Sequence, residues 1–261
     1  ASPHAARACT VRAVPQSADP AARPPRPCPP VPARPRKLSA TRVETWIRDP
    51  YATYARYVLG LKPLDPLDLD PSAADRGMVI HDAMERFVQA TMDAWPPDPA
   101  ALLERIGRES FGSLLEVPHV AAFWWPRFRR LAAWFLDFEV ERRAAGIGPA
   151  AVEAEGRMLI DGPAGPFELT ARADRIDAGP AGTDVLDYKT GRPPSAKQVA
   201  SGLSPQLPLE GAILAAGGFP GLPAAPPVAY TYVRLSGGRE AGARIEVGQG
   251  EAAALAEAAL Q

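Results

Sequence analysis

The spacing of apolar residues changes near residue 151, and this change separates a helical part of the chain from a part rich in strands. Before residue 151, apolar side chains recur every three or four positions, which predicts amphipathic helices with one face in a core. A connector rich in turn residues, 62–75, separates the second helix from the third. The expected helices span residues 41–48, 51–61, 77–89, 98–116 and 122–145.

Three local signals predict where these helices begin and end. Thr41 and Glu44 have the spacing of a capping box, in which each side chain accepts a hydrogen bond from a free N–H of the first helical turn. Pro50 disfavours helical geometry at Asp49, so the first helix should end before that residue. Gly146 suits the left-handed position that often follows a helix, and it predicts the end of the fifth one.

After residue 151, apolar and polar residues alternate, which predicts strands at 151–160, 166–177 and 184–189. Hairpin-like turns at 162–165 and 179–182 join them. A helix led by Gln206, strands near 228–235 and 242–247, and a final helix follow. This order predicts an α/β fold, a mixed β-sheet flanked by helices with an N-terminal helical portion. The absence of a βαβ series with Gly-rich turns argues against a nucleotide-binding fold.

Residues 1–37 differ in composition from the rest of the chain. They hold ten prolines, seven basic residues and one acidic residue, a local charge near +6. Such a stretch buries too little apolar area to fold alone, and its prolines favour extended conformations. We expect a disordered linker from an upstream domain, with a basic arm that contacts DNA as the alternative. The folded domain is expected at 38–261, and its last helix lacks a stop signal, which predicts a C-terminally truncated domain.

Composition narrows the class of protein. Apolar residues make up 46% of the chain, which supports a folded core. Cys9 and Cys28 are the only cysteines, and both lie in the Pro-rich stretch, so we expect a reducing compartment and no disulfide framework. No apolar run reaches the roughly 18 residues of a membrane span, and no signal peptide is visible. These features predict a cytoplasmic protein without a membrane partner.

The charge of the expected domain restricts how it can bind nucleic acid. Residues 38–261 carry 22 basic and 29 acidic residues, a net charge near −7. Arginine abundance alone says nothing about DNA, because an Ala/Pro/Arg-rich bias is typical of a GC-rich genome. Any contact with DNA must therefore come from a local groove rather than from the overall field.

The candidate chemistry lies on the second and third expected strands. Asp174 is on the second, while Asp187 and Lys189 share one face of the third because strand side chains alternate. A tight turn at 179–182 would bring the two carboxylates together. Adjacent carboxylates repel each other unless a cation lies between them, and oxygen ligands suit Mg²⁺. A divalent ion there would polarise a phosphodiester and activate water, and Lys189 could hold that water or neutralise developing charge.

Each of these residue types also has an ordinary structural interpretation. An Asp-x-Lys pair is common on protein surfaces, and His81 could be an exposed or core helix residue. Gln206 has a donor and an acceptor that suit sugar or phosphate, but it could equally cap its helix. Glu153 and Glu155 could be outer-shell metal groups or simply exposed. Turn and strand-end roles are expected for the remaining acids of the strands: Asp161, Asp177 and Asp184.

The order of the candidate residues along the chain resembles the order of motifs in a known family. A helix with Gly77-x-x-x-His81, an Asp174 strand, the stretch 187–191 (Asp-Tyr-Lys-Thr-Gly) and a helix led by Gln206 are similar to the RecB-like branch of the PD-(D/E)xK nucleases. Within that branch, residues 38–61 and 75–85 resemble the C-terminal nuclease domain of the AddB subunit of AddAB helicase–nucleases. The resemblance covers residues 38–261 and implies a restriction-endonuclease-like sheet.

The resemblance also implies roles for individual residues. Asp174, Asp187 and Lys189 would be catalytic, and Gln206 would contact DNA. Its motif usually has the form Gln-x-x-x-Tyr, but Glu210 stands at the Tyr position here. The family trims DNA strands at double-strand breaks in recombinational repair, while an AddA-like helicase–nuclease partner unwinds the duplex. The implied ligands of Mg²⁺, for which Mn²⁺ may substitute, are His81, Asp174, Asp187 and the backbone carbonyl of Tyr188.

Two other functions remain open: a stand-alone exonuclease of the CRISPR-associated type, and a catalytically silent relative that binds DNA. Many AddB-like proteins resemble one another in an iron–sulfur cluster that is bound by four cysteines and links two distant segments of the chain, here called the clasp. Here Asp49 stands where the first cysteine would precede a proline, and no cysteine occurs from residue 29 to 261, so no iron–sulfur cluster is expected. The work of that clasp is expected to fall to the packing of four apolar residues against the final helix: Trp46, Ile47, Tyr51 and Tyr54.

Overall fold

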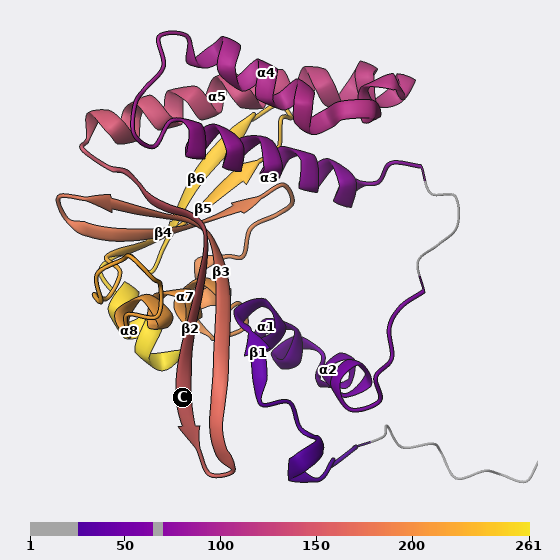
Figure 1. The fold of residues 1–261 in the computed structure, drawn as a ribbon, viewed down its shortest axis with the longest axis vertical. Coiled ribbons are helices and arrows are strands. Elements are labelled where there is room, and N and C mark those ends of the chain that lie inside the picture. Colours follow the sequence, from indigo (N-terminus) through magenta and orange to yellow (C-terminus); the bar gives the residue numbers. More distant parts are fainter. Residues whose placement is uncertain (1–25, 65–69) are drawn as a thin grey trace, which may run out of the picture.

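A six-stranded mixed sheet forms the centre of the computed structural model, which describes residues 26–64 and 70–261 (Figure 1). The strand order is β1-β3-β4-β5-β6, and β2 pairs with β3. The β1–β3 and β4–β5 pairs are parallel and the others antiparallel. The expected α/β class is therefore confirmed. The strands are β1 (Lys37–Ser39), β2 (Gly148–Gly162), β3 (Gly165–Gly179), β4 (Gly182–Lys189), β5 (Ala229–Leu235) and β6 (Gly242–Val247).

Helices flank the sheet on both sides. The first group, which lies together in Figure 1, consists of α3 (Ala73–Ala90), α4 (Pro99–Phe111) and α5 (Trp125–Ala144). The others are α1 (Ala40–Arg48), α2 (Pro50–Tyr57), α6 (Ala196–Ala200), α7 (Gln206–Ala215) and α8 (Ala252–Ala258). The parallel connection from β4 to β5 passes through α6 and α7. None of the helices in the described ranges is both long and apolar enough to cross a membrane.

The predicted capping box at Thr41 is wrong. The hydroxyl of Ser39 accepts the hydrogen bond from the N–H of Arg42 at 3.3 Å, and α1 begins before Thr41. Ser39 ends strand β1 in an extended conformation, which is the backbone geometry that a helix cap requires. A complete capping box occurs instead at α3, between Ser72 and Asp75.

The two predicted helix stops are confirmed. Helix α1 ends at Arg48, and Gly146 adopts φ +73° after α5. The predicted helix 51–61 is shorter, because α2 ends at Tyr57. The predicted helix 98–116 divides into α4 and a 3-10 turn at Gly112–Glu116, and a π-helical turn at Val120–Trp124 precedes α5.

Strands β2 and β3 form a long hairpin, and each is longer than the alternation of residue types predicts. Both expected turns are confirmed, one between β2 and β3 and one between β3 and β4. Gly165 and Gly182 take φ values of +99° and +131° in these turns, a conformation that side chains disfavour. The hairpin brings residues 148–179 into continuous antiparallel pairing, apart from an irregularity near its start.

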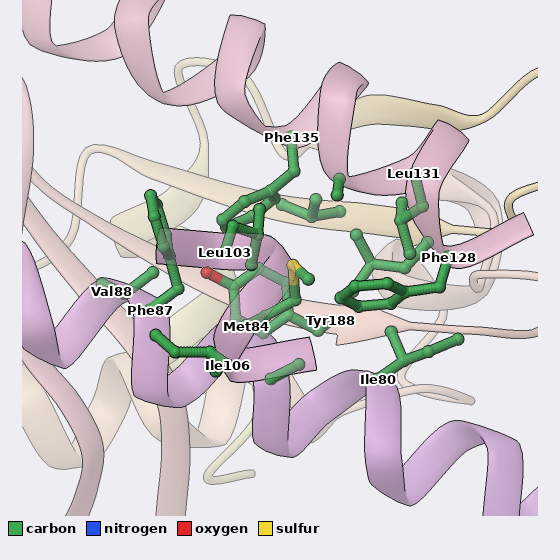
Figure 2. Packing of buried hydrophobic residues seen from close by; sticks show 14 of the residues in the cluster. Ile80, Met84, Phe87, Val88, Leu103, Ile106, Phe128, Leu131, Phe135 and Tyr188 are labelled. Atoms are coloured by element: carbon green, nitrogen blue, oxygen red, sulfur yellow. The ribbon is translucent and has the colours of Figure 1, made fainter. Parts of the chain in front are cut away.

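The larger core lies between α3, α4, α5 and the sheet (Figure 2). Phe87 contacts Phe135 edge-on at 6.2 Å between ring centroids, and Phe135 contacts Tyr188 of β4 at 6.0 Å. Three tryptophans pack against this cluster: Trp124, Trp125 and Trp134. The core therefore attaches α3 to the face of β4 that Tyr188 presents.

A second core lies between the sheet and helices α1, α7 and α8. Leu207 and Ile213 of α7 are fully buried against Val185 of β4 and Tyr230 of β5. Helix α7 is apolar along nearly its whole length and almost completely buried. This packing explains why its two polar residues, Gln206 and Glu210, face the interior of the domain.

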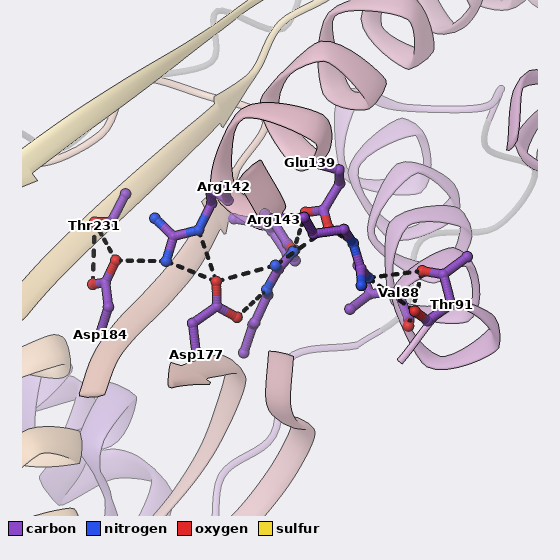
Figure 3. Close-up of polar contacts among 10 residues, drawn as sticks. Val88, Thr91, Glu139, Arg142, Arg143, Asp177, Asp184 and Thr231 are labelled. Carbon is purple, nitrogen blue, oxygen red and sulfur yellow. Dashed lines mark hydrogen bonds and ion pairs between the residues drawn. The ribbon is translucent and has the colours of Figure 1, made fainter. Parts of the chain in front are cut away.

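A buried ion network joins α5 to strands β3 and β4 (Figure 3). The guanidinium of Arg142 donates to Asp177 at 2.7 Å and to Asp184 at 2.9 Å. Arg175 pairs with Glu139 and donates to Asp177 at 2.5 Å. Asp177 and Asp184 lie opposite each other near the ends of β3 and β4 that adjoin the turn, as expected, but they also hold two buried arginines, which was not expected.

The part of the expected linker that the structure describes, from residue 26, packs against the domain. Residues 31–33 form a 3-10 turn, and β1 pairs with residues 168–170 of β3. Residues 1–25 lie outside the described ranges. The expected packing of residues 46–54 on the final helix is wrong: Trp46 and Tyr51 are half-exposed, and α8 packs on α7.

Candidate active site

The hairpin register brings the two candidate aspartates next to each other. Arg175 of β3 pairs with Leu186 of β4, so Asp174 and Asp187 occupy the next positions on these neighbouring strands. The backbone N–H of Tyr188 donates a hydrogen bond to Asp174 Oδ2 at 2.8 Å. This contact fixes the Asp174 carboxylate against β4, as the thirteen-residue spacing and the tight turn predict.

Asp187, Lys189 and Gln206 form a connected group beside these strands. Lys189 Nζ lies 2.7 Å from Oδ1 and 2.6 Å from Oδ2 of Asp187. The side-chain amide of Gln206 donates to Asp187 Oδ1 at 2.8 Å, and its oxygen accepts from Lys189 at 3.3 Å. Gln206 therefore positions both catalytic candidates. It does not cap α7, because no side chain caps that helix.

His81 approaches the aspartates from helix α3. Its Nδ1 lies 3.9 Å from Asp174 Oδ2, and its ring meets that of Tyr188 edge-on at 6.1 Å between centroids. Gly77, one turn earlier, faces Thr190, since an added Cβ would lie 3.1 Å from Thr190 Oγ1. The spacing Gly77-x-x-x-His81 thus lets α3 approach the end of β4 closely enough for His81 to reach the site.

The protonation of the site reflects burial and crowding of charge. Burial raises the pKa of Asp187 to about 6, and the charge of Asp174 adds to the effect. Burial also raises the pKa of Asp174 and lowers that of His81. Burial acts to lower the pKa of Lys189, but the Asp187 and Asp174 carboxylates outweigh it, so the amine stays charged.

Glu153, one of the two glutamates named above as possible outer-shell metal groups, is a neighbour of the site. It is the only non-glycine residue with a positive φ in the described part of the chain, at +49°. It stands between the pairs Val152–Arg175 and Ala154–Ala173, so it has no partner in the ladder and is nearest in register to Asp174. Its carboxylate pairs with Arg172 and is largely buried. Glu155, by contrast, is exposed.

We expect Glu153→Gln to stabilise the protein at alkaline pH. Burial, followed by the charge of Asp174, raises the pKa of Glu153 from 4.5 to about 7. A raised carboxyl pKa means that the folded state binds more protons, so stability falls as pH rises through this window. The variant should gain about 1–2 kcal/mol at pH 8, less than the full pKa change implies because solvent screens the carboxylate. Below pH 4.5 the gain should vanish.

Urea unfolding at pH 4, 6 and 8 in the presence of a chelator measures this effect. Glu155→Gln, which removes the same charge from an exposed position two residues away, is the matched control and should change stability little at each pH. If Glu153→Gln stabilises the protein no more at pH 8 than at pH 4, the pKa of Glu153 is not raised in the folded state.

Glu210 is a buried acid that the sequence does not place in the site. Its side chain is fully buried on α7, and Gln206 donates to its Oε1 at 3.2 Å. Burial raises the pKa of Glu210 well above its ordinary value, with the Asp187 charge acting in the same direction. Glu210 therefore orients Gln206 from inside the domain.

The donor set fits a hard divalent cation. Two buried carboxylates with raised pKa values gain most from a positive charge between them. Asp187 Oδ2 makes no hydrogen bond, and its close partner is the ammonium of Lys189. Within residues 26–64 and 70–261, no three His, Cys, Asp or Glu side chains already have the geometry of a metal centre. A cation at Asp187 would therefore compete with Lys189 for this carboxylate.

Comparison with known families agrees with this geometry. The model of the PD-(D/E)XK nuclease superfamily matches residues 37–261. The chain belongs to this superfamily. PD-(D/E)XK nucleases generally use divalent metals such as Mg²⁺, which suits the paired aspartates. Membership therefore indicates phosphodiester hydrolysis.

Individual relatives add the context of longer proteins. An uncharacterised protein of Rickettsia bellii is 29% identical over 213 residues, which are 81% of this chain and 25% of that protein. An uncharacterised protein of Rickettsia conorii is 30% identical over 193 residues, 72% of this chain and 23% of that protein. The chain thus spans about a quarter of the curated relatives that it matches. The crystal structure of SSO0001 aligns over 83% of this chain and 82% of its own at 12% identity, with a TM-score of 0.29.

Proposed function

We propose that this PD-(D/E)XK domain hydrolyses DNA phosphodiester bonds with the help of Mg²⁺, for which Mn²⁺ may substitute. The observation that carries the proposal is the connected set of Asp174, Asp187 and Lys189 on paired strands, with a charged lysine beside two buried carboxylates. A resident divalent ion would polarise the phosphate and lower the pKa of a bound water.

The side chains of this domain have distinct tasks in that reaction. Asp174, Asp187, His81 and the backbone carbonyl of Tyr188 are the ligand candidates. Lys189 presents its protonated amine to the scissile phosphate, where it stabilises the negative charge that develops during hydrolysis. Gln206 holds Asp187 and Lys189 in register by hydrogen bonds to both. A contact between Gln206 and DNA would require its side-chain amide to release one of its present hydrogen bonds, to Asp187, Lys189 or Glu210.

We further propose that the domain works as an AddB-like nuclease unit of a helicase–nuclease, with an AddA-like partner, in repair of double-strand breaks. The order of Gly77, His81, Asp174, the 187–191 stretch and Gln206 supports this branch. The relatives that are about four times as long as the matched region are consistent with a domain inside a larger protein. A stand-alone exonuclease remains the second candidate on the same chemistry.

Incubation of the full-length protein with end-labelled single-stranded DNA tests the reaction. We expect cleavage with Mg²⁺ or Mn²⁺ and none with a chelator. The isolated domain should bind duplex ends weakly, and its affinity should fall steeply with salt because contacts to phosphates dominate. Processive degradation by residues 38–261 alone would favour the stand-alone exonuclease, and intact DNA under all metal conditions would favour the silent relative.

A further inference from the structure

An apolar groove of about 860 Å³ lies beside the active site, between α1, α2, residues 26–38 and the end of the β2–β3 hairpin. Helices α1 and α2 lie on the same side of this hairpin as β1 in Figure 1. We call it the aromatic groove and define it by Trp46, Tyr51, Tyr54, Arg34, Arg36 and Arg48. It is distinct from the set of Asp174, Asp187 and Lys189, none of which lines it.

The aromatic side chains of this groove are unusually accessible. Trp46 is 50% exposed and Tyr51 is 52% exposed, although both are large and partly apolar. The other four tryptophans of the chain pack against the larger core. Tyr51 and Tyr54 stand 6.1 Å apart between ring centroids, so they continue the aromatic surface along α2. Exposed aromatic rings in a groove are suited to stacking against flat ligands.

The groove also concentrates positive charge in a domain whose net charge is negative. Four arginines line it, Arg26, Arg34, Arg36 and Arg48, against one acid, Asp49. Arg34 and Arg36 donate to backbone carbonyls, and those neutral acceptors leave the guanidinium charge in place. Arg48 pairs with Glu44 at 2.9 Å, so its charge is partly offset. The lining as a whole suits a polyanion.

Arg48 connects the aromatic groove to the catalytic residues. It lines the groove, and it also lines a cleft of about 440 Å³ together with Glu44, Lys189 and Arg192. A strand whose phosphate reached Lys189 would therefore pass Arg48 and arrive at Trp46. The basic cleft is suited to a phosphate backbone, and the aromatic surface beyond it is suited to bases.

We propose that the aromatic groove binds single-stranded DNA adjacent to the hydrolysed phosphodiester, with unpaired bases stacked on Trp46 and Tyr51. The proposal rests on the function proposed above and assigns the surface that holds the unwound strand next to the site. Paired bases in a duplex are stacked on one another and offer no free face, so duplex DNA would use the arginines and leave the aromatic rings without a partner.

Fluorescence anisotropy of a labelled oligothymidylate with the full-length protein tests this proposal, in a chelator so that no cleavage occurs. Trp46→Ala should weaken binding roughly 5- to 100-fold, the usual effect of losing one stacked base, and Trp46→Phe should restore part of it. An abasic oligonucleotide of the same length should bind the wild type at least as weakly as thymidylate binds Trp46→Ala, because it loses the stacking on Tyr51 as well. Oligothymidylate should quench part of the tryptophan fluorescence of the wild type, the abasic strand should not, and this quenching should be absent in Trp46→Phe, which keeps the other four tryptophans of the chain.

Phe123→Ala is the matched control, because Phe123 is 64% exposed and lies on the turn before α5. It should bind oligothymidylate like the wild type. Tyr51→Ala provides an independent variant if Trp46→Ala fails to fold by circular dichroism. Equal affinity of the wild type for abasic and thymidine strands overturns the proposal. The proposal is also overturned if Trp46→Ala and Tyr51→Ala both bind oligothymidylate with the affinity of the wild type. It is likewise overturned if a proline-rich peptide quenches the fluorescence of Trp46 and the oligonucleotide does not.

These outcomes separate the groove from the proposed reaction. A protein that shows Trp46-dependent binding in chelator but never cuts DNA with Mg²⁺ would refute the nuclease function and leave the groove standing. A protein that cuts DNA with Mg²⁺ but shows no difference between abasic and thymidine strands would refute the groove alone.

Discussion

Replacing Lys189 with alanine should lower the rate of DNA hydrolysis by about 100-fold or more while the protein still binds Mn²⁺. The amine of Lys189 is charged and directed at the carboxylates of the site, and loss of one such group at a developing negative charge usually costs about 10²–10³ in rate. Removing it also frees both oxygens of Asp187 from their ionic partner. Affinity for the cation should therefore be retained or raised, as isothermal titration calorimetry will show.

Asp187→Ala should behave differently, because it removes the carboxylate that the cation needs. Cleavage and Mn²⁺ binding should be lost together. Lys197→Ala is the matched control, since Lys197 is an exposed lysine on the nearby helix α6. Cleavage by Asp187→Ala at the wild-type rate, or parallel loss of metal binding in Lys189→Ala, would show that these residues have been given the wrong roles.

The part of the site on the hairpin was predictable because its geometry is local. Thirteen residues and one tight turn separate Asp174 from Asp187, and the alternation of strand side chains places Asp187 and Lys189 on one face. A turn rich in Gly and Pro between two alternating stretches determines the register, and the register determines the neighbours. The structure agrees on both turns and on the strand pairing.

The periodicity of apolar residues alone could not place His81 and Gln206 in the candidate site. His81 lies 93 residues before Asp174 and reaches it only because α3 packs on the face of β4 that carries Tyr188. That contact depends on the larger core, which single-residue patterns do not specify. Only the resemblance to a nuclease family placed these two residues near Asp187. The sequence named both Glu153 and Glu155 as possible neighbours of the site but could not choose between them, because the irregular backbone at Glu153 is not visible in the alternation of residue types.

The buried ion network was missed for a related reason. Arg175 occupies an inward position of β3, where the alternating pattern predicts an apolar residue, and its partner Glu139 lies 36 residues earlier on α5. An arginine in a strand normally indicates an exposed face. Here the partner acids are also buried, so no single position reveals the arrangement, and Asp177 and Asp184 look like ordinary residues near a turn.

We expect the largest loss of stability from a single change in this network. Arg175 is fully buried, and its guanidinium contacts Glu139, Asp177 and the hydroxyl of Tyr188. Arg175→Met keeps much of the side-chain volume but leaves the Glu139 and Asp177 carboxylates buried without this partner. Breaking one side of a buried ion pair usually costs about 3–5 kcal/mol, a large share of the roughly 5–15 kcal/mol that stabilises a domain. Urea unfolding followed by circular dichroism measures the loss.

Arg105→Ala is the control for this experiment, because Arg105 pairs with Glu109 on the exposed surface of α4 and should contribute at most about 1 kcal/mol. A second variant distinguishes two causes of instability, the loss of the ionic partner of the buried carboxylates and the loss of side-chain packing around Arg175. Arg175→Met combined with Glu139→Gln removes one of the two buried carboxylates that lose Arg175, although Glu139 keeps an ion pair with Arg143 at 3.6 Å, and it should recover part of the stability that Arg175→Met loses. If the single and double variants are equally unstable, packing around Arg175 rather than charge pairing holds β3 to α5. Because Arg175 follows Asp174 and contacts Tyr188, the same measurement shows how firmly the strands of the candidate site are attached to the helical layer.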